Sequence, residues 1–137
     1  MKKILFALSM LIALTACDED NNADPSNNDT GTVSGFLIGD NGLRITLLTD
    51  DEDNETYYFD SYLFVFSTDG KVTASDASNT VNGTYSVFRD DGRVELMMNF
   101  PNVQNFSELN DDWYFISINQ NTIRFNDDGD ILEFQKQ

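Results

Sequence analysis

Apolar and polar residues alternate along most of the chain after Val33, which is the pattern of β-strands rather than of helices. In residues 93–100, for example, every second residue from Val94 onward is apolar. One face of each strand would then be buried and the other solvated, as in an antiparallel sheet. The pattern predicts eight or nine strands, at residues 33–38, 43–49, 56–67, 71–75, 82–89, 93–100, 113–118, 121–126 and 130–136.

Tight-turn dipeptides separate these segments. Glycine supplies the positive φ that a two-residue hairpin needs, and Asn or Asp tolerates the left-handed region beside it. The turns are expected at Asn41-Gly42, Asp69-Gly70, Asp91-Gly92 and Asp128-Gly129, with a fifth at residues 119–121. A meander of this kind leaves two exposed edges unless it curls, so we expect an all-β fold that closes into a small barrel, with a tight two-layer sandwich as the alternative.

Two segments interrupt the alternation. Residues 57–66 are apolar on both faces, which indicates a bend at Asp60-Ser61 and a cover over one side. Residues 101–110 are the only long connection after Thr56. Phe106 and Leu109 are three positions apart there, so one helical turn could cap an open end of the barrel.

The first seventeen residues form a separate unit that predicts export. Two lysines precede an apolar run, residues 4–16, which is shorter than the roughly 20 residues that a membrane-spanning helix needs. The run ends in Leu14-Thr15-Ala16-Cys17, which matches the lipobox of bacterial lipoproteins. This match implies that Cys17 carries a diacylglyceryl group and an acyl chain such as palmitate, which anchor the mature protein in a membrane. The alternative is an ordinary signal peptide that contains a cysteine.

Residues 18–31 are too polar to fold and are expected to form an acidic, flexible tether before the β-barrel domain at residues 32–137. They contain five acidic residues, no basic residue and one apolar residue besides Pro25. The acidic cluster directly after Cys17 resembles the export signal that sends Bacteroidetes lipoproteins to the outer face of the outer membrane. A solvated linker without a targeting role is the equally simple alternative.

Charge and residue types exclude several classes of function. The 137 residues include 24 acidic and 8 basic ones, for a net charge of −16, so the clustered Lys and Arg that bind nucleic acid are missing. There is no histidine, and Cys17 is the only cysteine. This excludes Ser-His-Asp and Cys-His catalysis, the usual zinc sites and an intramolecular disulfide. We therefore expect a monomer without a cofactor, stabilised by one small core.

Carboxylates are the chemistry that remains. They gather in three turns, at Asp50–Glu55, Asp111–Asp112 and Asp127–Asp130, where Ca²⁺ could find oxygen ligands. None of the turns follows the EF-hand order, so solvated turns are the simpler interpretation and no metal site is expected. Paired carboxylates could also cleave a glycosidic bond, but a catalytic acid must be desolvated, and acids in turns stay in water.

Aromatic residues are the second set of candidates. A binding surface could include Trp113, Tyr114, Tyr57, Tyr58 and Tyr62. The alternation instead assigns several aromatic side chains to the core, namely Tyr62, Phe64, Phe66, Tyr85 and Trp113.

An ordered series of short motifs resembles a known family. Residues 62–74 contain Phe-x-Phe, Asp-Gly and Val-x-Ala; residues 82–87 contain Gly-Thr-Tyr; residues 109–114 include the tryptophan; and residues 131–136 contain Leu-x-Phe. This order is similar to that of the lipocalin-like lipoproteins of Bacteroidetes, over about residues 40–137. The Gly-x-Trp that true lipocalins carry in their first strand is Gly35-Phe36-Leu37 here.

The resemblance implies an antiparallel barrel or half-barrel behind a lipid anchor, with no assigned activity. We expect a non-enzymatic cell-envelope protein, anchored in the outer membrane through Cys17 and able to face the cell surface. Its β domain would bind an unknown protein or small molecule. The alternatives are a carrier of a small hydrophobic ligand with an interior pocket and, third, a carboxylate-dependent surface hydrolase. A barrel this small fills with its own side chains, which disfavours a large ligand-binding cavity.

Overall fold

The computed structural model describes residues 29–39 and 41–137, so the signal segment, Cys17 and most of the acidic tether lie outside the described residues. No helix in the described part is long and apolar enough to cross a membrane. The elements, in chain order, are α1 (Thr30–Leu37), β1 (Leu43–Asp50), β2 (Asp53–Asn54), the 3₁₀ turn η1 (Thr56–Tyr58), β3 (Leu63–Phe66), β4 (Lys71–Ser75), β5 (Thr80–Asp90), β6 (Arg93–Asn99), the 3₁₀ turn η2 (Phe106–Leu109), β7 (Asp112–Ile118), β8 (Thr122–Asp127) and β9 (Asp130–Lys136).

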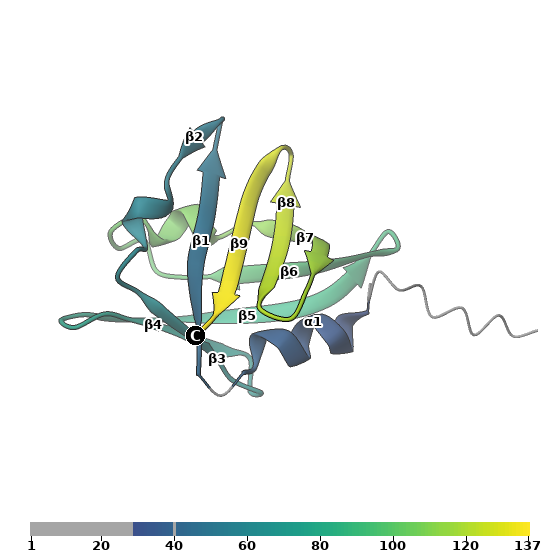
Figure 1. The fold of residues 1–137 in the computed structure, drawn as a ribbon, viewed down its shortest axis with the longest axis horizontal. Helices are drawn as coiled ribbons and strands as arrows, with labels where there is room; N and C mark the ends of the chain where they lie inside the picture. The colour runs from purple at the N-terminus through teal and green to yellow at the C-terminus, as the bar shows by residue number, and fades with distance from the viewer. Residues whose placement is uncertain (1–28, 40) are drawn as a thin grey trace, which may run out of the picture.

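The strands form a closed antiparallel barrel, as the sequence predicts, and not a sandwich. Eight strands, β1 and β3 to β9, form the barrel, and each pairs with the next one in chain order. The last strand, β9, pairs with β1 and closes the barrel. β2 is an extra strand that pairs only with the end of β1. Figure 1 shows β1, β9 and β8 standing upright in front of β5 and β6, which cross behind them. Closure leaves few free strand edges, which removes the cost of an open meander.

Three of the four Asx-Gly dipeptides join consecutive strands as predicted, whereas Asn41-Gly42 lies between α1 and β1 and not between two strands. At the β5–β6 and β8–β9 connections both central residues have positive φ: 44° and 78° for Asp91-Gly92, and 45° and 106° for Asp128-Gly129. This is the pattern of the type I′ turn, whose twist matches that of the strands on either side. Consecutive strands are therefore joined with a defined register.

Side chains fill the interior of the barrel. Phe64 lies near its centre, with ring centroids 5.5 Å from Phe134 and 6.2 Å from both Phe59 and Phe100. Gly83 makes room for this packing, because a Cβ atom there would lie 2.6 Å from the ring of Phe100. The family-like motifs supply much of the core, namely Phe64, Phe66, Val72, Ala74, Leu132 and Phe134.

The strand predicted at residues 33–38 is wrong, because this segment forms helix α1. The Asp29 side chain accepts a hydrogen bond from the Thr32 backbone N–H (3.3 Å) and caps the helix. Val33, Phe36 and Leu37 are buried, at the spacing of one helical face. The helix also takes in the last two residues of the predicted tether, Thr30 and Gly31.

The strand predicted at residues 56–67 is divided. Its first part is η1, its last part is β3, and the chain turns at Asp60-Ser61, where the sequence predicts a bend. Thr56 explains the division, because its Oγ1 accepts a hydrogen bond from the Leu48 backbone N–H at 2.9 Å and holds the start of η1 against β1. β2, which precedes η1, was not predicted.

Candidate functional site

The three acidic turns of the sequence meet at one end of the barrel. The end of β1 and the start of η1 contribute Asp50 and Glu55, and Asp130 begins β9. The loop before β7 contributes Asp111, and the short helix η2 adds Glu108, which was not among the sequence candidates. We call this end the acidic mouth and define it by Asp50, Glu55, Glu108, Asp111, Asp127 and Asp130.

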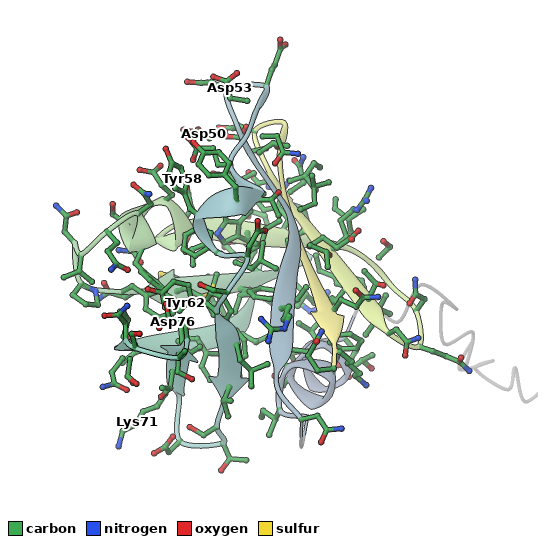
Figure 2. All side chains as sticks on the ribbon, turned by 60° about the vertical axis from the view of Figure 1, so that its left-hand side comes forward. Asp50, Asp53, Tyr58, Tyr62, Lys71 and Asp76 are labelled. Atoms are coloured by element: carbon green, nitrogen blue, oxygen red, sulfur yellow. The ribbon has the colours of Figure 1, made fainter. Side chains whose placement is uncertain are left out.

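A strained hairpin brings the first turn to the mouth. Asp51 and Glu52 connect β1 to β2 with φ values of 47° and 72°, the left-handed region that few side chains occupy. The Asp51 backbone N–H donates a hydrogen bond to Asp130 Oδ1 at 3.0 Å, which ties the hairpin to the start of β9. Figure 2 shows Asp50, Asp53 and Tyr58 together at this end and Lys71 at the opposite end.

The mouth surrounds a small cavity with carboxylate oxygens. The cavity has a volume of about 90 Å³, and its lining contains no Lys or Arg. Carboxylate oxygens of Asp50, Glu55 and Glu108 lie within 4.8 Å of one another. Glu55 Oε2 is buried from solvent and has no hydrogen-bond partner among the described residues. A buried oxygen of this kind costs free energy unless a cation or a donor reaches it.

Crowding of the acids changes their protonation. Burial raises the pKa of Glu55 above its usual value, and the nearby charges of Glu108 and Asp50 raise it further. Burial also raises the pKa of Asp127 to about 6, together with its hydrogen bond to the Asp111 side chain. Burial and neighbouring acids raise the pKa of Asp130, although the Asp51 N–H opposes this rise. These carboxylates therefore lack cationic partners.

An apolar layer lies beneath the mouth. Phe106 and Leu109 are buried, and they form the single helical turn that the sequence predicts for this connection. Trp113 is buried beside them and donates its Nε1–H to the Leu109 carbonyl at 3.2 Å. Asn110 closes the layer, because its side chain accepts from the Phe100 N–H at 2.6 Å and donates to the Phe100 carbonyl at 2.8 Å.

Two tyrosines flank the mouth on η1. The Tyr57 and Tyr58 rings have centroids 4.3 Å apart, and the Tyr57 side chain is largely exposed. The Tyr58 hydroxyl shares a hydrogen bond with Tyr57 that favours its protonated form, and this bond, burial and the charges of Glu55 and Glu108 raise the pKa of Tyr58 to about 12. Of these two aromatic candidates, Tyr57 lies at the surface, whereas Tyr58 is partly buried against the core.

The other sequence candidates have separate places. Tyr62, Phe64, Phe66 and Trp113 are buried, as predicted, whereas Tyr85 is only partly buried. Tyr114 is also partly covered, with the Arg93 guanidinium 4.0 Å from its ring centroid. The remaining acids of the three turns are exposed and do not line the cavity, namely Asp51, Glu52, Asp53, Asp112 and Asp128.

Basic side chains lie elsewhere on the barrel. Arg124 forms an ion pair with Glu133 at 2.8 Å on the outer wall, and Lys71 forms one with Asp69 at 3.4 Å. The Lys136 ammonium lies 4.4 Å from the centroid of the Phe36 ring, at the end of the barrel that α1 covers. Asp69 and Glu133 thus have cationic partners, while the acids of the mouth face one another.

Comparison with known proteins yields one partial match. No protein-family model matches the chain, and no curated protein matches it. A solved structure, that of a DUF4847 family protein from Bacteroides vulgatus ATCC 8482, aligns with a TM-score of 0.44 and 21% sequence identity. The alignment covers 59% of this chain and 64% of that protein, so the chain spans less than two thirds of that protein's length. At this level of likeness, the barrel assignment rests on the strand pairing alone.

Proposed function

We propose that the protein is a non-enzymatic, lipid-anchored binding module of the bacterial cell envelope, which binds a divalent cation of the calcium class at its acidic mouth. The observation that carries this proposal is the buried Oε2 of Glu55, which lines a carboxylate cavity and has no partner. A cation would satisfy this oxygen and would neutralise the charges that face it. The proposal departs from the sequence-based expectation that Asp50 and Glu55 lie in a solvated turn without a metal site.

The donor set fits a hard cation. Every side-chain donor in the cavity lining except the Trp113 ring is an oxygen, from carboxylates and from the hydroxyls of Thr49 and Ser107. Ca²⁺ takes six to eight oxygen ligands in irregular geometry, whereas Mg²⁺ demands a near-ideal octahedron. Three carboxylates from two separate segments, with water completing the shell, suit the less demanding ion. The volume of about 90 Å³ leaves room for an ion with a few waters.

The lipid anchor is the second part of the proposal, and it rests on the lipobox that ends at Cys17. We expect acylated Cys17 to place the mature protein in the outer membrane. In cell fractionation, Cys17→Ser should move most of the protein out of the membrane fraction, and mass spectrometry should find acyl chains on the wild-type residue. A wild-type Cys17 without lipid would contradict the anchor and leave the cation site unaffected.

The structure favours the cation over the two other interpretations. A carrier would need an interior pocket, and aromatic and aliphatic side chains fill this interior. Two larger hollows, of about 410 and 390 Å³, lie against β5 and β6 at Thr84 and Asn99, but they are shallow and no buried unpaired side-chain atom lies in their lining. A hydrolase would use a carboxyl group with a raised pKa, such as that of Asp127, but Asp127 does not line the cavity. The cavity itself, at about 90 Å³, is well below the roughly 300 Å³ of small-molecule pockets.

Calorimetric titration of the mature chain with CaCl₂ tests the cation site. We expect one ion per chain, and Glu55→Gln should weaken binding by about tenfold or more because it removes a charged ligand. Asp91→Asn is the matched control, since it removes one exposed charge from the distant β5–β6 turn. Equal weakening by both variants would mean diffuse charge screening instead of a site.

Binding should also depend on pH. Because the cation competes with protons for Glu55, whose pKa is raised, affinity should fall as the pH is lowered from neutrality. Titration with MgCl₂ at matched ionic strength separates the two ions. A response to Mg²⁺ equal to that to Ca²⁺ would contradict the calcium class.

A further inference from the structure

The barrel has one weak seam, between β1 and β3. β1 pairs with β9 through five residue pairs, from Leu43 to Leu48, but with β3 only through Leu43 and Phe64. β3 is also short, so the part of β1 after Leu43 has no barrel strand on the side opposite β9. Figure 1 shows β2 and η1 beside this part of β1. We call residues 51–62 the seam segment, because they cover this gap.

The seam segment is held at its base by apolar contacts. Phe59 and Tyr62 pack edge-to-face on Phe106 of η2, with ring centroids 5.2 and 5.0 Å apart. The Tyr62 hydroxyl also donates to Gln104 Oε1 at 2.6 Å. Phe106 and Gln104 belong to residues 101–110, which we call the cap segment. The two segments therefore close the barrel by packing against each other.

At their outer edge the same two segments repel. Glu55 of the seam segment and Asp50 just before it face Glu108 of the cap segment, with carboxylate oxygens within 4.8 Å. Like charges at this distance repel, and the effect is strongest on Glu55, whose Oε2 is shielded from water, while Asp50 and Glu108 are more exposed. Since the cavity lining has no Lys or Arg, only a cation from solution can turn the repulsion between these carboxylates into a net attraction.

We propose that the cation acts as a latch, which holds the seam segment against the cap segment and opens the barrel at the β1–β3 seam when it leaves. This inference rests on the proposed function, because it assigns a consequence to occupancy of the same site. With the cation bound, the carboxylates of Asp50, Glu55 and Glu108 share one centre of positive charge. Without it, their repulsion works against the packing of Phe59 and Tyr62 on Phe106. The aromatic interior behind the seam then becomes accessible.

Hydrogen–deuterium exchange of the mature chain, with and without saturating CaCl₂, tests the latch. We expect backbone amides of the seam and cap segments to exchange about tenfold more slowly with Ca²⁺, while the β5–β6 hairpin at residues 88–94 changes little. The fluorescence of an apolar dye, which reports exposed aromatic surface, should fall in parallel. NaCl at matched ionic strength serves as the control for screening.

Variants test the repulsion without any added ion. Glu108→Gln removes the charge of the cap segment, so in calcium-free buffer both segments should exchange more slowly than in the wild type. Asp91→Asn, with the same net charge, should not have this effect. If Glu108→Gln does not fold, Glu55→Gln removes the opposing charge from the seam segment and gives the same test.

The outcomes separate the two proposals. If calorimetry detects Ca²⁺ but exchange is unchanged, or slows uniformly over the domain, the latch is wrong and the cation site stands. If calorimetry detects no Ca²⁺, the proposed function fails and the latch fails with it. Slower exchange in Glu108→Gln would then show only that the carboxylates repel.

Discussion

The two ends of the barrel are closed by opposite means. At one end, α1 buries Val33, Phe36 and Leu37 against the barrel, and the Lys136 ammonium covers the Phe36 ring. We call this the closed end. At the other end, five carboxylates line a polar cavity, Asp127 lies beside one of them, Asp111, and a strained hairpin holds one of the three acidic turns in place. The closed end gains stability from apolar burial, whereas the mouth retains unfavourable electrostatics that a ligand could relieve.

The largest change in stability is expected when a buried ring is removed from the apolar layer at either end of the barrel. Phe106→Ala should cost about 3–5 kcal/mol in the free energy of unfolding, because it removes a fully buried ring. Phe36→Ala, at the closed end, should cost a similar amount. Urea unfolding measures both. Only Phe106→Ala should also weaken Ca²⁺ binding, and equal effects on binding would remove the functional difference between the ends.

A second prediction concerns the polar closure of the layer beneath the mouth. Asn110→Ala removes both hydrogen bonds to the Phe100 backbone and leaves these groups partly buried without partners. We expect a loss of about 1–3 kcal/mol in the free energy of unfolding. Asn110→Asp retains the acceptor but not the donor and should recover part of the loss. Full stability in Asn110→Ala would show that water replaces the amide.

The pH dependence of the free energy of unfolding tests how much the crowded carboxylates of the mouth destabilise the fold. Because the folded protein raises the pKa of Asp127 from 3.8 to about 6, the stability that its proton provides is complete below about pH 4 and is lost as the pH rises past 6. Asp127→Asn should therefore stabilise the calcium-free protein at pH 7.5 by about 1 kcal/mol, after allowance for solvent screening, and much less at pH 4. Thermal unfolding at both pH values measures the difference. A variant that is less stable than the wild type at pH 7.5 would contradict the assignment.

The smallest effect is expected on the outer wall, where acids have partners. Arg124→Gln breaks the ion pair with Glu133, whose side chain also accepts from the Thr46 hydroxyl at 2.8 Å. A pair that is partly exposed contributes about 0.5 kcal/mol, so the melting temperature should change little. A loss well above 1 kcal/mol would mean that the wall, as well as the mouth, depends on its charges.

The sequence predicts the barrel better than it predicts either end. Alternation and Asx-Gly turns act locally, so most strands lie within a few residues of their predicted bounds. Val33, Phe36 and Leu37 have helical spacing, but glycines and β-branched residues surround them and give no helical propensity. Packing against the barrel decides their conformation.

The mouth shows a different limit of sequence analysis. Its acidic turns are visible as residues, and the helical turn at Phe106 is predicted with its capping role. Their meeting point depends on closure of β9 onto β1, which pairs residues that are 84 to 93 positions apart in the chain. Glu108 carries no local signal, since its part in the site follows from the burial of Phe106 and Leu109 on either side of it.

The position of α1 also determines the end of the barrel at which the preceding chain is attached. Since the chain enters the barrel through this helix, any attachment upstream of Thr30 pulls on the closed end. An acyl group at Cys17 would then leave the cavity on the side remote from the lipid headgroups. The electrical double layer of an anionic bilayer concentrates cations only within about 8 Å of its surface. A cavity held beyond that distance would respond to the calcium level of the surrounding medium and not to that of the membrane surface.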